Sequence, residues 1–549
     1  MFWILLFLIH VSSLYVQATF SNTANYIGSS YPSPFGYRFG TGGLIRSSFS
    51  TATIKSKIST AVVTFAVNGI AEIYINGQRI GGSEFAPGRR VLDPALTQYE
   101  QRMFYVSINV TDLLNANGTT NNIGIVLGRG HWGHYEYGKV GILLQLQVNQ
   151  QIVLETNSFP NNTWYTTPSP IQDDDLFNGE FYNGTLAQEL GWSSTFAKWS
   201  NETEDPTNIW KPISTTSAYN YPPTATNTTE DLKNIQKPIS KTSDYYYPPI
   251  LTNQEISIPP TVTSVPRQPI AIHWMNSTSA VVDFGENGAG WSRLEIVNHY
   301  NNNNNNDNDK YSNKYRNTSI PSLQHRTITM EHTEMVHSLT KDVFNQFPCP
   351  IPTRVCVQQT NRYIRSKQAV NSLNNNNEMY EPKFVWFGFR YVKVTGCTAI
   401  RMPGSATTTT IYTSFNNSFN TSLNNSLNNS FNNSFNNQTN PLSNSSTVTC
   451  IVTAIRASTN FTASTTRPSL TFPDAPILTK ISNMITRTVL SNQIGYQTSC
   501  PTREKVAWNG DTLVTAPTLL LLVNQQQGIQ YLRNYVRSLA DNFDLSLIR

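Results

Sequence analysis

The stretch AVVTFAVNGIAEIYING, residues 61–77, decides the fold class of this chain. Apolar residues run or alternate along residues 61–67 and again along residues 71–75, and an Asn-Gly pair follows each run. Short runs of β-branched and aromatic residues, broken by Asn-Gly pairs, are typical of strands that tight turns connect. The stretch therefore predicts short β-strands joined by tight turns.

Further strands are expected on both sides, over residues 44–154, because residues 105–110, 123–127 and 140–148 keep the same spacing. Regular short strands with few helical periods favour an antiparallel sandwich or jelly roll. A second β-rich block covers residues 270–396. The sequence therefore predicts two antiparallel β-sandwich, jelly-roll-like domains.

Helical periodicity begins only after Asp474, where Pro476 suits the start of a helix. Two further apolar segments follow at 513–523 and 529–539, and the first helix is marked by apolar residues at helical spacing, namely Ile477, Ile481, Met484, Ile485 and Val489. The three predicted helices have apolar faces without a visible partner, so we expect a helical domain that is cut short.

These patterns divide the 549 residues into segments of different character. The expected segments are a signal peptide (1–18), an N-terminal β-sandwich (42–200), a linker with a tandem duplication (201–265), a second sandwich with Asn-rich inserts (266–400), a low-complexity Asn/Ser-rich segment (401–468) and a partial helical domain (469–549).

Composition narrows the partners and the compartment. Charged residues make up 13% of the chain, and the net charge of +5 is spread without a Lys/Arg cluster, which argues against a nucleic-acid surface. An apolar run at residues 2–9 followed by Val16-Gln17-Ala18 predicts a secretory signal, and no apolar stretch is long enough to predict a membrane span. We expect a secreted or extracellular protein, with a lysosomal or vacuolar lumen as the alternative.

Glycosylation sequons support secretion. They occur along the whole chain, at Asn109, Asn117, Asn161, Asn183, Asn201, Asn227, Asn276, Asn317 and Asn460 among others. The sequence carries no signal for an oligomeric state.

The five cysteines leave two interpretations open. In an oxidising compartment Cys349 could pair with Cys356, and Cys397 with Cys450 across the low-complexity segment, which leaves Cys500 over. The alternative is five separate buried thiols.

Residues 499–511, SCPTREKVAWNGD, resemble the DCPQRE...GW.GD segment of the α-L-rhamnosidases of glycoside hydrolase family 78. Other segments are similar to that family in the same order, at residues 42–49 with 67–82, 108–133, 176–192, 281–296 and 381–396. The resemblance implies an N-terminal sandwich, a concanavalin-like sandwich and the truncated start of an (α/α)6 barrel.

The resemblance also implies an inverting hydrolysis of terminal α-L-rhamnose from glycosides or polysaccharides. Glu504 would be the general acid and Asp511 an assisting carboxylate, while Ser499, Arg503 and Trp508 would bind substrate. Ser499 stands where the family has an Asp, and the family's general base, a late Glu of the barrel, has no counterpart among these residues. We therefore expect the chain to be inactive alone. A non-catalytic, secreted carbohydrate-binding glycoprotein and an incomplete gene model are the alternatives.

Metal and cofactor signals are weak. The run Asp173-Asp174-Asp175 suits either calcium or a solvated loop. His131, His134 and Glu136 superficially resemble a zinc site, but we expect a Gly-rich loop there rather than the helix such a site would use. Trp132, between the histidines, would either face a sugar or plug the sheet edge. We expect no metal site and no organic cofactor.

Overall fold

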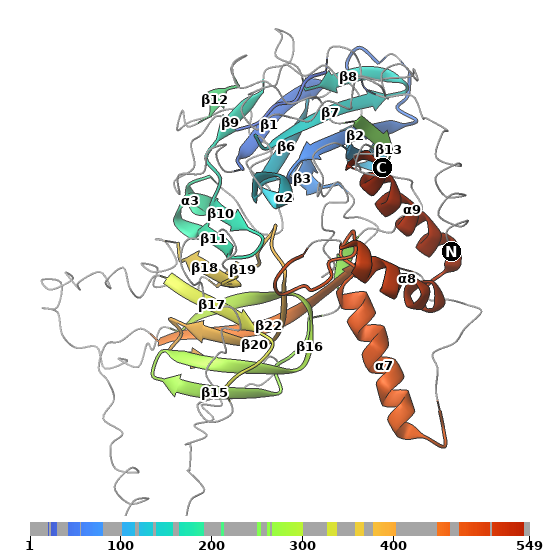
Figure 1. Ribbon diagram of the computed structural model, residues 1–549. Coiled ribbons are helices and arrows are strands. Elements are labelled where there is room, and N and C mark those ends of the chain that lie inside the picture. Colours follow the sequence, from blue (N-terminus) through green and yellow to red (C-terminus); the bar gives the residue numbers. More distant parts are fainter. Residues whose placement is uncertain are drawn as a thin grey trace, which may run out of the picture.

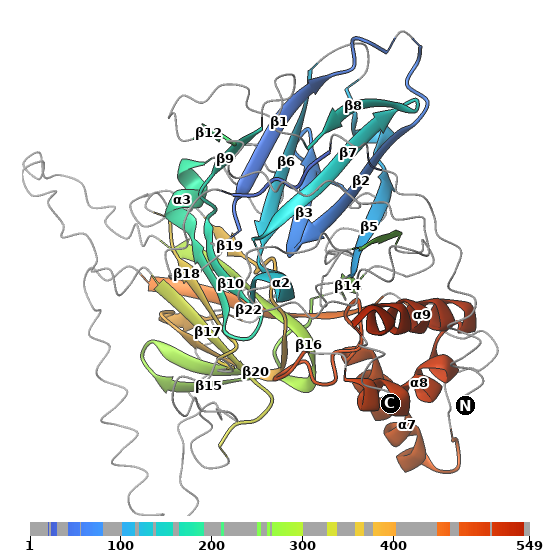
Figure 2. The same ribbon diagram turned by 45° about the horizontal axis from the view of Figure 1, so that its top comes forward.

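The structure is a computed structural model. It describes residues 20, 24–29, 42–54, 56–80, 102–115, 120–134, 139–156, 164–190, 210–213, 250–253, 261–263, 266–299, 327–337, 357–366, 377–401, 447–459, 461, 472–505 and 508–542. Figure 1 shows two β-rich bodies, one above the other, with a group of helices at one side of the lower one. Figure 2 shows the same arrangement from a tilted view.

The first β-rich body consists of two packed sheets. One sheet has the order β12-β9-β1-β6-β3-β4 and the other the order β13-β5-β2-β7-β8. The strands are β1 (Leu44–Ser50), β2 (Ala61–Asn68), β3 (Ile70–Ile75), β4 (Gln78–Arg79), β5 (Arg102–Asn109), β6 (Thr120–Gly128), β7 (Gly141–Val148), β8 (Gln151–Glu155), β9 (Tyr165–Thr167), β12 (Lys211–Pro212) and β13 (Ile250–Asn253). A short helical turn, η2 (Thr111–Leu113), follows β5.

The core of this sandwich lies between the two sheets. Ile45 and Ile73 reach it from one sheet, while Val63 and Leu144 reach it from the other, and all four are buried. Side chains alternate between the faces of a strand, so one apolar face of each sheet is removed from water.

The two predicted Asn-Gly turns differ in the structure. Asn76 and Gly77 have φ angles of 50° and 81° and join β3 to β4 in a two-residue hairpin, as expected. The expectation was wrong at Asn68-Gly69, because β2 and β3 lie in different sheets. There Gly69, with φ of 124°, lets the chain cross from one sheet to the other.

The second β-rich body is built around an 11-stranded sheet with the main order β10-β11-β18-β17-β20-β16-β22-β14. Its strands are β10 (Ile171–Asp175), β11 (Gly179–Asn183), β14 (Thr261–Thr263), β15 (Ala271–Asn276), β16 (Ser279–His299), β17 (Thr327–Thr333), β18 (Thr360–Ile364), β19 (Glu378–Tyr380), β20 (Phe387–Thr395), β21 (Ala399–Ile400) and β22 (Thr447–Thr459).

Strand β16 bends this sheet onto itself. Its first part pairs with β15 and β20, its last part pairs with β19 and β22, and the register with β20 shifts between Asp283 and Gly288. A bulge of this kind increases the local twist of a strand. The apolar residues of both parts, such as Val282 and Leu294, enter one buried core.

Strands β10 and β11 tie the two bodies together. Both come from the chain between the first body and α3 (Gly184–Glu189), yet β11 pairs in parallel with β18 of the second body. Leu44 and Val126 of the first body share a buried cluster with Trp291 and Phe384 of the second. The two bodies therefore share a buried apolar cluster.

The predicted helices are confirmed as α7 (Pro476–Ser491), α8 (Asn509–Leu522) and α9 (Gln525–Asn542). Val489 of α7 packs against Leu519 and Tyr531. The rest of the predicted apolar face of α7 is exposed in the described part of the chain, at Ile477, Ile481, Met484 and Ile485.

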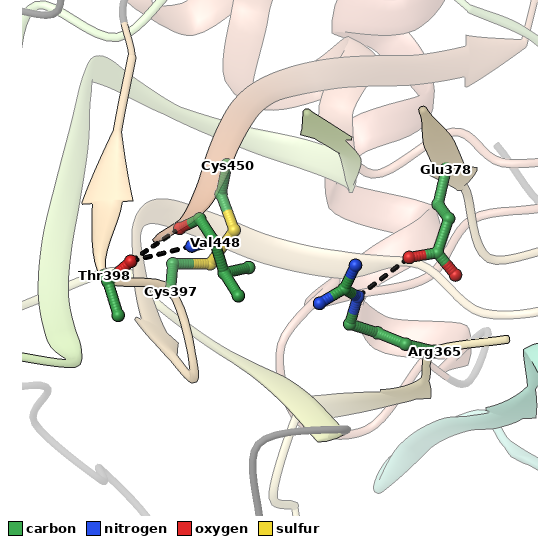
Figure 3. Close-up of a disulfide and its surroundings, with 6 residues drawn as sticks. All are labelled: Arg365, Glu378, Cys397, Thr398, Val448 and Cys450. Carbon is green, nitrogen blue, oxygen red and sulfur yellow. Dashed lines mark hydrogen bonds and ion pairs between the residues drawn. A yellow bond between two sulfur atoms is a disulfide. The ribbon is translucent and has the colours of Figure 1, made fainter. Parts of the chain in front are cut away.

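The cysteine pairing is confirmed for Cys397 and Cys450, which form a disulfide with a Cα–Cα distance of 5.9 Å (Figure 3). The alternative of five separate thiols is therefore wrong. Cys500 is a free thiol, and Cys349 and Cys356 lie outside the described residues.

Several predicted segments also lie outside the described residues, namely the signal peptide, most of the duplicated linker, the Asn-rich inserts and most of the low-complexity segment. The predicted domain boundaries stay predictions. In the described part of the chain, no helix has the length and apolar character that crossing a membrane requires.

Candidate active site

The signature segment forms the connection between α7 and α8. After α7 ends, an isolated bridge between Gln493 and Gln497 closes a tight bend, and Thr459 at the end of β22 donates its backbone N–H to the carbonyl of Gln493. Ile494 of this bend is buried in the apolar cluster between the two β-rich bodies. The segment is thus held against the contact of the two bodies before the signature begins.

The structure brings three of the predicted site residues together. The indole Nε1 of Trp508 donates a 2.5 Å hydrogen bond to Oε2 of Glu504, and the backbone N of Trp508 donates a long one of 3.4 Å to Oγ of Ser499. The backbone N of Glu504 donates to Sγ of Cys500 at 3.2 Å. Ser499, Glu504 and Trp508 therefore form one small group at the start of α8.

The other two predicted site residues lie at the rim of this group. Arg503 is exposed, and Asp511 is exposed in the first turn of α8. A carboxylate in the first turn of a helix is stabilised by the free backbone N–H groups there. In the described part of the signature, the side chain of Asp511 shares none of the hydrogen bonds of Glu504, so the seven-residue spacing does not by itself join the two carboxylates.

Sequence reasoning missed Lys505, whose side chain is fully buried. Its Nζ donates to the backbone carbonyls of Leu176 and Trp386. The ammonium also lies 5.6 Å from the ring centroid of Phe177, 5.2 Å from Trp386 and 5.0 Å from Phe387. The only signal in the sequence was its place next to Glu504, since one Lys carries no information about its own burial.

The backbone of Lys505 is held as firmly as its side chain. Its carbonyl accepts from the hydroxyl of Tyr496 at 2.8 Å and contacts Nε2 of His131 at 2.9 Å. Burial lowers the pKa of His131 to about 3, so the imidazole is neutral at physiological pH and its Nε2–H donates to that carbonyl. The loop thus contacts α2 (Gly130–His134) of the first body as well.

The histidines expected in a Gly-rich loop lie instead on the short helix α2, so that expectation was wrong. His131 binds the signature loop, whereas Nδ1 of His134 contacts Oδ2 of Asp175 at 2.9 Å. Glu136 lies outside the described residues. Trp132 is 4% exposed and packs among apolar side chains, so the interpretation as a sugar-facing ring was wrong, while a plug of the sheet edge stays a prediction.

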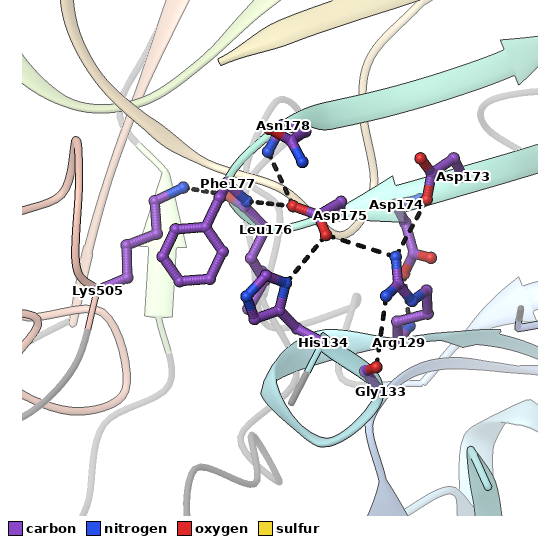
Figure 4. Close-up of polar contacts among 10 residues, drawn as sticks. All are labelled: Arg129, Gly133, His134, Asp173, Asp174, Asp175, Leu176, Phe177, Asn178 and Lys505. Carbon is purple, nitrogen blue, oxygen red and sulfur yellow. Dashed lines mark hydrogen bonds and ion pairs between the residues drawn. The ribbon is translucent and has the colours of Figure 1, made fainter. Parts of the chain in front are cut away.

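The acidic run 173–175 forms a charge cluster with Arg129 and His134 (Figure 4). The guanidinium of Arg129 lies 3.3 Å from Asp173 and 3.5 Å from Asp175. Burial by itself raises the pKa of Asp175, but the hydrogen bond with His134 and the charge of Arg129 outweigh it and hold the pKa below its usual range. The Asp175 carboxylate is therefore charged.

Asp174 lies in the same cluster and behaves differently. Burial raises its pKa to about 8 although Arg129 opposes the shift, so it is mostly protonated at neutral pH. Among the residues that the structure describes, no group of three or more His, Cys, Asp or Glu side chains is placed to hold a metal ion. Calcium binding at this run stays a prediction.

A second set of contacts locks the two bodies together beside the site. Nζ of Lys383 donates to Oε2 of Glu72 at 2.6 Å, and Glu180 accepts from the backbone of Lys383 and from the hydroxyl of Tyr380. These are charge-assisted, largely buried hydrogen bonds, the stronger kind in proteins. The two bodies are therefore held together by polar as well as apolar contacts.

Comparison with known proteins finds similarity to α-L-rhamnosidases. Two family models match, the α-L-rhamnosidase N-terminal domain over residues 56–225 and the bacterial α-L-rhamnosidase six-hairpin glycosidase domain over residues 471–543. An α-L-rhamnosidase of Formosa agariphila is 27% identical over 156 residues, which cover 26% of this chain and 15% of that protein. One of Streptomyces avermitilis is 28% identical over 144 residues, covering 25% of this chain and 13% of that protein.

Solved structures agree in fold. The α-L-rhamnosidase of Dictyoglumus thermophilum aligns with a TM-score of 0.58 at 21% identity, covering 95% of this chain and 44% of that one. The enzyme of Aspergillus terreus aligns with a TM-score of 0.56 at 19% identity, covering 92% of this chain and 44% of that one. The chain thus spans less than half the length of these proteins. The chain thus resembles the α-L-rhamnosidases in the segments that the two family models match, and it shares the fold of the solved structures.

Proposed function

We propose that this chain contributes the acid side of an inverting α-L-rhamnosidase site, which releases terminal α-L-rhamnose from glycosides or polysaccharides. The observation that carries the proposal is the hydrogen bond between Trp508 and Glu504, on a loop that lies inside the segment matched by the six-hairpin glycosidase model. A similar solved structure supports L-rhamnose as the sugar, since the Streptomyces avermitilis α-L-rhamnosidase was solved in complex with L-rhamnose.

In the proposed reaction, protonated Glu504 gives its proton to the glycosidic oxygen as the bond from the anomeric carbon to that oxygen breaks. Water attacks the anomeric carbon from the opposite face and loses its proton to a base carboxylate, so the configuration inverts. Asp511 assists with its negative charge near the oxocarbenium-like transition state. Ser499, Arg503 and Trp508 hold the sugar by a hydroxyl, a guanidinium and an indole ring.

We infer that the 549-residue chain does not release rhamnose by itself. An inverting site needs its acid and base roughly 6.5–9.5 Å apart, with room for a water between them. Glu504 hydrogen-bonds Trp508 and Cys500 in the described part of the chain, and no residue of the 549 matches the late Glu that is the base in the family that the chain resembles. Asp511 follows on the same short stretch, which suits an assisting charge better than a base on the far side of the sugar.

The experiment incubates the purified chain with an aryl α-L-rhamnoside and measures the released aryl alcohol, with Glu504→Gln as the matched variant. We expect no release from either. Release that Glu504→Gln abolishes would overturn the inferred inactivity and support the acid assignment. Release that survives Glu504→Gln would overturn the acid assignment itself.

One observation favours a second candidate function, a non-catalytic carbohydrate-binding glycoprotein. Ser499 stands where the family has an acidic residue, so this position supplies a hydroxyl without the negative charge that stabilises a cationic transition state. A glycan-array measurement separates the two candidates. Binding that survives Glu504→Gln, with no turnover in any longer version of the protein, favours the binding function.

We also propose that the protein is secreted and glycosylated, with a lysosomal or vacuolar lumen as the alternative compartment. Two of the sequon asparagines, Asn109 and Asn276, are exposed. The disulfide between Cys397 and Cys450 also suits an oxidising compartment.

A further inference from the structure

Two neighbouring residues of the signature loop have opposite environments. Glu504 is half-buried and its carboxylate meets the exposed Trp508, whereas the next side chain, Lys505, is fully buried against the turn between β10 and β11 and the start of β20. The acid and the buried cation are one residue apart. Any displacement of Lys505 therefore moves the backbone that carries Glu504.

The ammonium of Lys505 joins parts of the chain that are far apart in sequence. Leu176 lies in the turn between β10 and β11, and Trp386 lies just before β20, so the two accepting carbonyls belong to different strand connections. Figure 4 shows the Lys505 side chain reaching toward this turn beside Phe177. Aromatic ring faces attract a cation, and the attraction grows when water is excluded. The pocket thus offers Lys505 Nζ two carbonyl acceptors and three aromatic rings.

The loop backbone is strained where the side chain is anchored. Lys505 has φ of 50°, and Ser499 at the other end of the turn has φ of 57°. Residues other than glycine rarely adopt these angles, and they persist where surrounding contacts enforce them. At Lys505 those contacts are the two carbonyls bound by Nζ, and the carbonyl that accepts from Tyr496 and His131.

The loop also fits closely against β20. A Cβ atom added at Gly388 would lie 2.4 Å from Oγ1 of Thr502 and 3.0 Å from Cγ of Pro501. The turn that carries Glu504 therefore lies directly on the backbone of this strand, and the Lys505 side chain passes alongside it to reach Trp386.

We propose that Lys505 is a positioning residue for the acid: by tying the signature loop to the turn between β10 and β11 and to the segment before β20, it fixes the place from which the Glu504 carboxylate acts. That Lys505 positions a catalytic acid rests on the proposed function. That Lys505 holds the loop in place does not depend on it. Without the anchor, the loop loses its contacts with the turn at Leu176 and relaxes from its positive φ angles, and Glu504 leaves its partner Trp508.

The test compares the full chain with Lys505→Met, which keeps the length of the side chain but removes its charge and donors. Lys505→Arg retains a cation with donors, and Lys480→Met removes an exposed Lys of α7. Val282→Ala, in the core of the second body, is the control for a general loss of stability, because it destabilises the fold without removing a contact of the loop. The readouts are amide hydrogen exchange of residues 499–505 and the rate at which iodoacetamide alkylates Cys500, both followed by peptide mass spectrometry.

We expect Lys505→Met to speed exchange of residues 499–505 and alkylation of Cys500 by about tenfold or more, equivalent to about 1.4 kcal/mol of local stability. Lys505→Arg should restore part of the protection, while Lys480→Met and Val282→Ala should leave the loop as in the parent chain. Lys505→Met and Val282→Ala are compared at temperatures at which the two variants are equally stable. If Lys505→Met then speeds exchange and alkylation no more than Val282→Ala does, Lys505 is merely part of the core and the proposal is overturned.

These readouts need no turnover, so they are distinct from the test of the proposed function. Glu504→Gln should leave loop exchange within about twofold of the parent, because its amide still accepts the Trp508 hydrogen bond. If a rhamnoside is hydrolysed, Lys505→Met should lower kcat with little change in KM. If the loop of Lys505→Met stays as protected as in the parent, Lys505 does not anchor it, whether or not hydrolysis is found. If Lys505→Met loosens the loop but the protein hydrolyses no rhamnoside, the anchor stands and only the catalytic role of Glu504 fails.

Discussion

The indole nitrogen of Trp508 and the carboxylate of Glu504 are joined by a hydrogen bond of 2.5 Å, four residues apart along the chain. The bond spans the junction between the signature turn and α8, and the Trp508 ring remains about half exposed, at 50%. One oxygen of Glu504 is therefore oriented by the protein, while an aromatic face beside it stays open to a ligand.

Two substitutions of Trp508 should distinguish the role of its aromatic ring from the role of its N–H donor. We expect Trp508→Ala to weaken L-rhamnose binding by roughly tenfold, or about 1.4 kcal/mol, because the aromatic face is lost. Trp508→Phe retains a ring face and should retain most of the affinity. Isothermal titration with L-rhamnose measures both, and equal affinities of Trp508→Ala and the parent chain would argue against a sugar contact at this ring.

The stability of the folded chain should depend on pH through Lys505. Burial lowers its pKa from 10.5 to about 7, against the opposing charges of Asp175 and Cys500, while the nearby His131 and His332 are neutral. Between pH 7 and 10.5 the unfolded chain holds a proton that the folded chain releases, so the free energy of unfolding rises with pH in this window.

Chemical denaturation of the parent chain and Lys505→Met over that pH range isolates this effect, because other titrating groups cancel in the difference. We expect the parent to gain stability relative to the variant from pH 7 to 10.5, with no further change below pH 7. A difference that stays constant across the window would show that the amine does not titrate there.

Loss of the disulfide should destabilise the second β-rich body. Cys397 and Cys450 are 53 residues apart, and closing a loop of this length contributes about 4 kcal/mol in the chain-entropy model. We expect Cys397→Ala/Cys450→Ala to lower the midpoint of thermal unfolding in calorimetry. A reductant should lower the midpoint of the parent toward that of the double variant and leave the double variant unchanged. A parent chain insensitive to reductant would contradict the role of this bond.

The buried carboxylate of Glu378 should be far more costly to lose than an exposed one. It accepts from Nε of Arg365 at 2.8 Å (Figure 3). It also accepts from the hydroxyl of Tyr363 at 3.0 Å and from the backbone of Ser366 at 2.8 Å. Glu378→Ala leaves the Arg365 charge buried without this carboxylate, which costs about 3–5 kcal/mol. Urea unfolding of Glu378→Ala measures the loss, with Glu334→Ala on the exposed hydrogen bond to Asn287 as a control that should cost far less.

The sequon asparagines should differ when the protein is made in a secreting eukaryotic cell. Asn276 is exposed at the turn between β15 and β16, so Asn276→Gln should remove one glycan from the intact mass and leave stability unchanged. The side chain of Asn183 caps α3 by accepting from the backbone of Thr185 and Leu186, so Asn183→Ala should cost about 1 kcal/mol. An unchanged mass for Asn276→Gln would show that this site is unoccupied.

Much of the fold follows from local pattern. The strands over residues 61–77 and the helix at Pro476 were predictable, because alternation and helical spacing are properties of neighbouring residues. The crossing of the chain between sheets at Asn68-Gly69 was not predictable, since a turn signal does not reveal which sheet each strand joins. The pairing of β11 with β18 escaped for the same reason, because these strands are nearly 180 residues apart.

By itself the sequence determined the sandwich class, the helices and the identity of the signature residues, because these depend on local periodicity and on a short motif. Only the tertiary structure decided between the two cysteine interpretations, and only it placed Lys505 between Leu176 and Trp386 beside Glu504. The physical reason is that burial, pairing and the pKa of a side chain depend on residues brought together from distant parts of the chain. The resemblance of a motif proposes Glu504 as the acid, while packing decides how firmly its loop is held.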